Sequence, residues 1–107
     1  MGVYIYVDSR ISVRGTKKDI EKICRIKDGW GKPAFTERDG QVYMRSEMEG
    51  LDPVKDGIVR PIDELCGYAK ENNIVLRGHV NVSCAISDYD GIGMIISRDS
   101  YHWRKRR

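Results

Sequence analysis

The 107-residue sequence contains no apolar run that approaches the roughly 18 residues needed to cross a membrane. Its N-terminal segment, MGVYIYVDSR, lacks the basic and the uninterrupted apolar regions of a secretion signal. Tyr6 stands where an N-myristoylated chain carries Ser or Thr. We therefore expect a cytoplasmic protein without a membrane partner.

Cysteine and histidine are also scarce. The three cysteines, Cys24, Cys66 and Cys84, stand singly at wide spacings, which matches neither a paired zinc motif nor an even disulfide framework. Because each falls on a predicted apolar face, we interpret them as buried structural thiols. The two histidines, His79 and His102, do not form a recognisable ligand set. The sequence therefore predicts no metal site, no cofactor and no catalytic residue.

The net positive charge of the chain comes from its last four residues. Without them, 19 cations against 16 anions become 15 against 16. Residues 1–27 hold seven cations and three anions, whereas residues 37–56 hold three cations and six anions. We expect a basic tail, formed by Arg104, Lys105, Arg106 and Arg107. The acidic stretch, which could mimic nucleic acid, consists of Glu37, Asp39, Glu47, Glu49, Asp52 and Asp56.

The N-terminal quarter of the chain combines a strand pattern with a helix signal. Residues 3–14 alternate apolar and polar side chains, as a strand with one buried face does, although the polar segment 8–10 leaves a hairpin open. Thr16 and Asp19 then resemble a capping box that starts a helix. The exposed side of this helix would be a basic patch of Lys17, Lys18, Lys22 and Arg25.

The dipeptide Asp39-Gly40 lies between PAFTER and QVYMRSEM and predicts a β-hairpin, because both turn residues tolerate a positive φ. A two-residue turn pairs Phe35 with Met44. The apolar side chains on the core side of this hairpin would be Phe35, Val42, Met44 and Met48.

Residues 58–69 carry apolar side chains at steps of three and four, which predicts a second helix. Asn72-Asn73 marks its end. Gly67 costs stability inside a helix, so it indicates a close approach between this helix and the sheet.

Residues 74–86 show the longest alternation of apolar and polar side chains in the chain and predict a strand with one solvent-exposed side. The turn SDYDG then leads into a partner strand that starts at Ile92. We expect this last strand to continue through Tyr101 and Trp103, with only residues 104–107 left as a free tail.

The element order predicts one α+β domain over residues 1–107, with a ferredoxin-like split βαβ fold in which two helices cover one face of an antiparallel sheet. The other face of the sheet would then be open to a partner. The candidate binding residues on it are Tyr4, Tyr6, Tyr43, Arg77, His79 and Asn81.

Four segments, SRISVRGTKKDIEKI, WGKPAF, VRPIDELCGYAKEN and SDYDGIGMII, resemble small ferredoxin-like proteins of phages and conjugative plasmids, the YubB type. The resemblance covers most of the chain as a pattern rather than as a run of identities. It departs at Ala34-Phe35, where the family tends to have a second Trp, and at Val59-Arg60-Pro61, where it tends to have Trp-x-Pro-Pro. The resemblance implies the fold above and a phage or mobile-element origin, and it implies no catalytic residue.

Three functions agree with these patterns. The first is a non-enzymatic binding protein of phage or mobile-element type, a counter-defence inhibitor similar to an anti-CRISPR. Such a protein would dock on a nucleic-acid-handling protein or nucleoprotein complex of a bacterial host. The second is a direct nucleic-acid binder that uses the basic first helix and the tail. The third, least favoured, is a small metal-free nuclease in which His79 is the acid or base, Ser83 assists and Arg77 anchors phosphate.

Self-association is also open at this point. The strand predicted over residues 74–86 is long enough to pair with the same strand of a second copy. The aromatic pair Tyr101 and Trp103 could also form a contact with a twofold mate. A homodimer is therefore among the expected assemblies.

Overall fold

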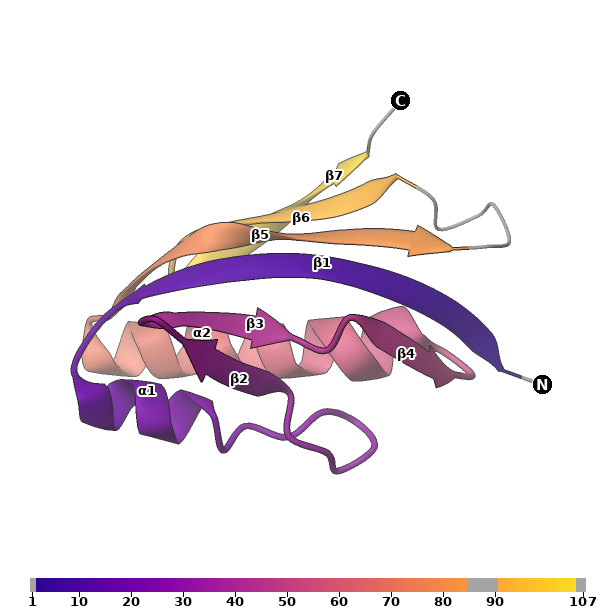
Figure 1. Ribbon diagram of the computed structural model, residues 1–107. Coiled ribbons are helices and arrows are strands. Elements are labelled where there is room, and N and C mark those ends of the chain that lie inside the picture. The colour runs from indigo at the N-terminus through magenta and orange to yellow at the C-terminus, as the bar shows by residue number, and fades with distance from the viewer. Residues whose placement is uncertain (1, 85–90, 106–107) are drawn as a thin grey trace.

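The computed structural model describes residues 2–84 and 91–105 (Figure 1). Over these residues the chain has an α+β fold with two α-helices and a seven-stranded antiparallel sheet. The elements are β1 (Val3–Arg14), α1 (Lys17–Ile23), β2 (Phe35–Arg38), β3 (Gln41–Met44), β4 (Glu47–Gly50), a π-helical turn η1 (Lys55–Val59), α2 (Arg60–Asn72), β5 (Val75–Cys84), β6 (Ile92–Arg98) and β7 (Ser100–Lys105). Within the described part, no helix is both long and apolar enough to span a membrane.

The strands lie in the order β2-β3-β1-β5-β6-β7, and β4 pairs with β1 beyond the end of β3. Figure 1 shows the sheet arching over α2, with α1 on the same side. None of the described helices covers the opposite side, which we call the open face. The predicted α+β class is therefore confirmed, with more strands than the predicted plan contains.

Residues 3–14 form one strand, which resolves the alternative between a strand and a hairpin. The side chains of Ile5, Val7, Ser9 and Ile11 are all buried, so the alternation continues through the polar segment 8–10. Ser9 is tolerated in the core because its hydroxyl oxygen accepts a hydrogen bond from the backbone N–H of Met44 at 2.8 Å.

The central hairpin forms as predicted. Phe35 pairs with Met44 in an antiparallel register, and the turn residues Asp39 and Gly40 have φ angles of 54° and 79°. Positive φ at both positions is the requirement of a type I′ turn, whose twist matches that of the strands. The four apolar side chains expected on the core side are all buried: Phe35, Val42, Met44 and Met48.

The second helix also follows its pattern, with one error of detail. Ile62, Leu65 and Ala69 are buried against the sheet, and a fully buried Ile or Leu side chain contributes about 1.5–3 kcal/mol. Asn73 ends the helix in the left-handed conformation, with a φ angle of 54°. Gly67 is exposed, however, and a Cβ added there would meet no atom within 4 Å. The prediction of a close helix-to-sheet approach at Gly67 is therefore wrong.

The C-terminal segment folds back instead of continuing β6. The chain turns at Arg98, whose φ angle is 67°, and β7 returns beside β6 with Ser97 opposite Ser100. This turn brings Tyr101 to the helix side, where its hydroxyl donates a hydrogen bond to Asp63 on α2 at 2.8 Å. The prediction of a single strand through Tyr101 and Trp103 is therefore wrong.

The basic tail is correspondingly shorter than predicted. Arg104 and Lys105 belong to β7, where they lie opposite Gly93 and Ile92. Arg106 and Arg107 lie outside the described residues.

Candidate binding site on the open sheet face

The sheet is interrupted between β3 and β4, next to the middle of β1. Ile11 pairs with Val42 on one side of the interruption and Ile5 pairs with Met48 on the other, in one unchanged register. No residue is therefore inserted, and the interruption is a local departure of the strand rather than a bulge. In a continuous ladder the backbone N–H of Met44 would bond to the backbone of β1. Here it donates instead to the side-chain hydroxyl of Ser9.

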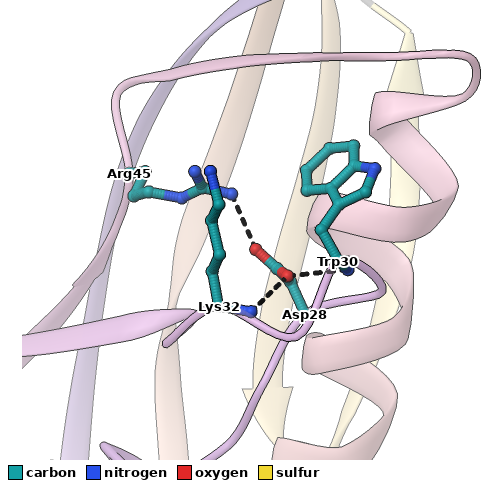
Figure 2. A network of polar contacts seen from close by, with 4 residues as sticks. All are labelled: Asp28, Trp30, Lys32 and Arg45. Carbon is teal, nitrogen blue, oxygen red and sulfur yellow. Dashed lines mark hydrogen bonds and ion pairs between the residues drawn. The ribbon is translucent and has the colours of Figure 1, made fainter.

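Arg45 explains the departure (Figure 2). Regular alternation would point Arg45 to the open face, like Tyr43, but its guanidinium reaches the loop after α1. There Nη2 pairs with Oδ2 of Asp28 at 2.6 Å. The other oxygen of Asp28 accepts hydrogen bonds from the backbone N–H groups of Trp30 and Lys32 at 2.9 and 3.0 Å. Because the Asp28 side chain is only 1% exposed, it requires these donors.

The inward turn of Arg45 leaves Ser46 exposed and hollows the open face on both sides of it. One cavity of about 450 Å³ lies toward β2 and β3 and is lined by Arg38 and Tyr43, among others. A second cavity of about 550 Å³ lies toward β4 and β5. Ser46 and Asp8 line both cavities, so the two cavities adjoin each other. We call them together the hollow.

At the β4 end of the hollow, tyrosines and carboxylates alternate across the strands. Tyr4 lies opposite Glu49 and Tyr6 lies opposite Glu47. The two rings meet edge to face with centroids 5.2 Å apart, and the residues are 38% and 47% exposed. With Asp8, next on the same face of β1, these residues form what we call the acid–tyrosine end.

A hydrogen bond joins the Tyr4 hydroxyl, as donor, to the carboxylate of Glu47. This bond raises the pKa of Tyr4 to about 12, with smaller contributions from burial and from the nearby negative charges. Tyr4 therefore stays a neutral donor at physiological pH, and its ring is fixed in place beside Tyr6.

At the other end of the open face, basic residues from four strands lie in two neighbouring rows. In one row, Arg10 lies opposite His79, which lies opposite Ile95, which in turn lies opposite His102. In the next row, the order is Arg38, Gln41, Ser12 and Arg77. We call the charged and imidazole members the basic band: Arg10, Arg38, Arg77, His79 and His102.

Two side chains of the basic band are held by their neighbours. Arg10 donates a hydrogen bond to the side-chain oxygen of Gln41. The guanidinium of Arg38 lies over the ring of Tyr43, 4.6 Å from its centroid, in a cation–π contact. The band is therefore partly preorganised and faces solvent.

The structure places all six predicted open-face residues on one surface, but in different surroundings. Tyr4 and Tyr6 belong to the acid–tyrosine end, and Arg77 and His79 belong to the basic band. Asn81 lies between the two, opposite Asp8. Tyr43, the sixth, borders the hollow.

The predicted basic patches do not form one surface. The four cations of α1 are exposed on the helix side of the sheet: Lys17, Lys18, Lys22 and Arg25. Figure 1 shows α1 and the end of β7, which carries Arg104, at opposite ends of the molecule. A nucleic-acid site made jointly by the first helix and the tail would therefore need to span the whole protein.

The predicted acidic stretch is likewise divided among three places. Glu37 and Asp39 lie at the β2–β3 turn, where the Glu37 carboxylate accepts a hydrogen bond from a backbone N–H at 2.7 Å. Glu47 and Glu49 point to the open face from β4. Asp52 caps the turn before α2, and Asp56 pairs with Arg60 at 3.2 Å. The β4 pair lies on the open face itself, and Glu37 lines the hollow from the β2–β3 turn.

The His79 and Ser83 side chains of the nuclease alternative lie apart. His79 and Ser83 are four residues apart on one strand, which separates them by about 13 Å, far beyond hydrogen-bond reach. Among the residues that the structure describes, no three His, Cys, Asp or Glu side chains are grouped to hold a metal ion.

The cysteines are spread over three elements and differ in burial. Cys66, on α2, is buried, and burial raises the pKa of its thiol to about 11. Cys24 and Cys84 are only partly buried, so the prediction of three buried thiols holds fully only for Cys66.

Sequence reasoning missed Asp8, Arg10, Arg38, Ser46 and His102 as members of the site. The hairpin turn alone could have placed Arg38 opposite Gln41. The positions of Arg10 and His102 depend on pairing between strands far apart in the sequence, which no local pattern reveals.

No known family model matches the chain, and comparison with curated proteins and with solved structures finds no match either. The open face is therefore interpreted from its own geometry.

Proposed function

We propose that this chain is a small non-enzymatic binding protein that docks through its acid–tyrosine end on a basic surface of a host nucleic-acid-handling protein. A counter-defence inhibitor of phage or mobile-element type, similar to an anti-CRISPR, would act in this way in the cytoplasm of a bacterial cell. The observation that carries the proposal is the exposure of Tyr4 and Tyr6 on an uncovered sheet face among Asp8, Glu47 and Glu49.

The chemistry of this end suits a basic protein partner. Tyrosine is enriched in protein interfaces because its ring buries a large area while its hydroxyl still finds a hydrogen-bond partner. Carboxylates in a fixed pattern complement the Arg and Lys side chains that line nucleic-acid-binding grooves. Because the Tyr4 hydroxyl is already bonded to Glu47, part of the surface is ordered before binding.

We also propose that the fold is a ferredoxin-like plan with an added hairpin, in keeping with the resemblance to the YubB-type proteins. The order β2-β3-β1-β5, with α1 and α2 as the connections on one side, supports this assignment. The hairpin of β6 and β7 would then be an extension that widens the open face.

The test compares two double variants with the same change in charge. Glu47→Lys/Glu49→Lys reverses the acid–tyrosine end, and Glu64→Lys/Glu71→Lys reverses two exposed carboxylates of α2. Each tagged protein is incubated with a nuclease-treated bacterial lysate, and the captured proteins are quantified. We expect the wild-type chain and the α2 variant to retain the same nucleic-acid-handling protein, and the β4 variant to lose it.

Equal capture by both variants would show that the acid–tyrosine end is not the docking surface. Capture restricted to proteins that do not handle nucleic acids would refute the proposed class of partner. Circular dichroism of each variant checks that both remain folded.

The basic band favours a second candidate function, direct nucleic-acid binding, at a site other than the predicted helix and tail. This function uses residues different from those of the acid–tyrosine end.

A further inference from the structure

We propose that the basic band binds the phosphate backbone of a single-stranded nucleic acid. The proposal does not depend on a protein partner at the acid–tyrosine end, because the two sites share no residue. It assigns the ligand by charge, by spacing and by the aromatic groups at the border of the band.

The three arginines of the band come from three different strands and meet only because of the sheet register. Arg38, Arg10 and Arg77 lie on β2, β1 and β5, which spreads them over three strand spacings, about 14 Å. With His102 on β7, the band crosses about 24 Å of sheet. An extended chain of phosphates laid across the strands would therefore meet a cation or an imidazole repeatedly along its path.

Carboxylates border the basic band on two sides. Asp8 lies one row away on β1, beside the hollow. Glu37 and Asp39 lie at the β2–β3 turn beyond Arg38, and the Glu37 carboxylate is engaged by the N–H of Gly40. A phosphate backbone is thus repelled toward Asp8 and beyond the β2–β3 turn, whereas Arg14, which follows Ser12 on the same face of β1, extends the attraction on the remaining side.

The side chains beside the band favour a single strand over a duplex, because the bases of a duplex are paired and stacked in its interior. Bases of a single strand, in contrast, can turn into the hollow and stack on Tyr43, whose ring already carries the Arg38 guanidinium.

The expected salt dependence follows from the number of arginines. If Arg10, Arg38 and Arg77 each neutralise one phosphate of a single strand, the log-log slope of affinity against salt is about −2.1. Affinity then falls about 20-fold between roughly 50 and 200 mM salt.

The probe is a fluorescent oligothymidine of about 20 nucleotides, a length that covers the band in any binding register. Its anisotropy is measured against the full chain over the same salt range. The variant Arg10→Gln/Arg38→Gln/Arg77→Gln should abolish most of the binding and flatten the salt slope. The matched control Lys17→Gln/Lys18→Gln/Lys22→Gln loses the same charge from α1 and should stay within about twofold of wild type.

Arg77→Gln alone guards against misfolding of the triple variant, because Arg77 is exposed. It should reduce the magnitude of the slope by about 0.7. Equal losses of affinity in the band and α1 variants would mean that net charge, not the band, attracts the probe. Tighter binding of a duplex of the same length would overturn the single-strand assignment. Glu47→Lys/Glu49→Lys should retain oligonucleotide binding, which keeps failure here separate from failure of the protein-docking proposal.

Discussion

Arg45→Ala offers the sharpest test of how the open face acquires its hollow. The substitution leaves the Asp28 carboxylate buried. The carboxylate keeps its two backbone N–H donors and loses the guanidinium. Removing one partner from a fully buried ion pair costs about 3–5 kcal/mol. The Arg45 side chain is 34% exposed, so water can reach part of the vacated space and the expected loss is smaller. We expect the free energy of unfolding to fall by about 2–3 kcal/mol, in the range of a lost hydrogen bond to a charged group.

Urea denaturation followed by far-ultraviolet circular dichroism measures this loss. The control is Arg60→Ala, which removes the helical ion pair to Asp56. The Arg60 side chain is 59% exposed, and such a pair contributes about 0.3–0.5 kcal/mol. If Arg45→Ala lowers the free energy of unfolding no more than Arg60→Ala does, the contact with Asp28 does not hold the segment between β3 and β4 away from β1. This explanation of the hollow is then refuted.

Two further predictions concern β7 and the packing of the helices. Burial and the hydrogen bond to Asp63 raise the pKa of Tyr101 to about 12, above its ordinary value of 10, so the folded state binds this proton more tightly than the unfolded state does. The resulting stability is fully present below pH 10 and is lost as pH rises from about 10 to 12. Urea midpoints across that range should fall more steeply for wild type than for Tyr101→Phe, and equal slopes would contradict the assignment. Gly57→Ala should destabilise by about 1–3 kcal/mol, because its Cβ would clash with Sδ of Met48 and lie 3.1 Å from Cζ3 of Trp30. Gly67→Ala, with open space around its Cβ, should stabilise by up to about 1 kcal/mol, and thermal melts that rank the two variants in the opposite order would contradict this reasoning.

The elements that the sequence predicts well are those with a local cause. The capping box of Thr16 and Asp19 forms, with the Asp19 N–H donating to the Thr16 hydroxyl at 3.2 Å. The hairpin at Asp39-Gly40 forms in the predicted register. Each depends on residues within a few positions of one another, so propensity and turn chemistry determine it.

The errors arise where a distant contact decides the conformation. The turn at Arg98 carries no Gly or Asn, and its advantage is that Tyr101 reaches Asp63 on α2. Arg45 follows the alternation of a strand in the sequence, yet the buried carboxylate of Asp28 turns it inward. Neither outcome is visible without knowing which segments pack together.

The functional site shows the same division. The pattern of β5 correctly places Arg77 and His79 on the solvent side, but the acid–tyrosine end and the basic band appear only when β1, β3, β4 and β5 are aligned. Counting charges along the chain groups Glu37 with Asp56, which the fold separates, and separates Arg10 from Arg77, which the fold brings within two rows.

This rearrangement of charge changes what the net charge of +3 means for binding. A uniformly basic surface would attract any polyanion, whereas the open face carries its cations and its carboxylates at opposite ends with the hollow between them. A partner that presents phosphate at one end and basic side chains at the other would satisfy both ends at once, as a protein bound to a single strand does. A partner with only one of these chemistries would leave the other end unsatisfied and in part repelled. The two sets of variants therefore give more information together than either set alone. If the acid–tyrosine end and the basic band act on the same nucleoprotein, combining Glu47→Lys/Glu49→Lys with Arg77→Gln should weaken capture from a lysate with intact nucleic acid by about the product of the separate effects, whereas ends that bind different partners should each lose only their own partner.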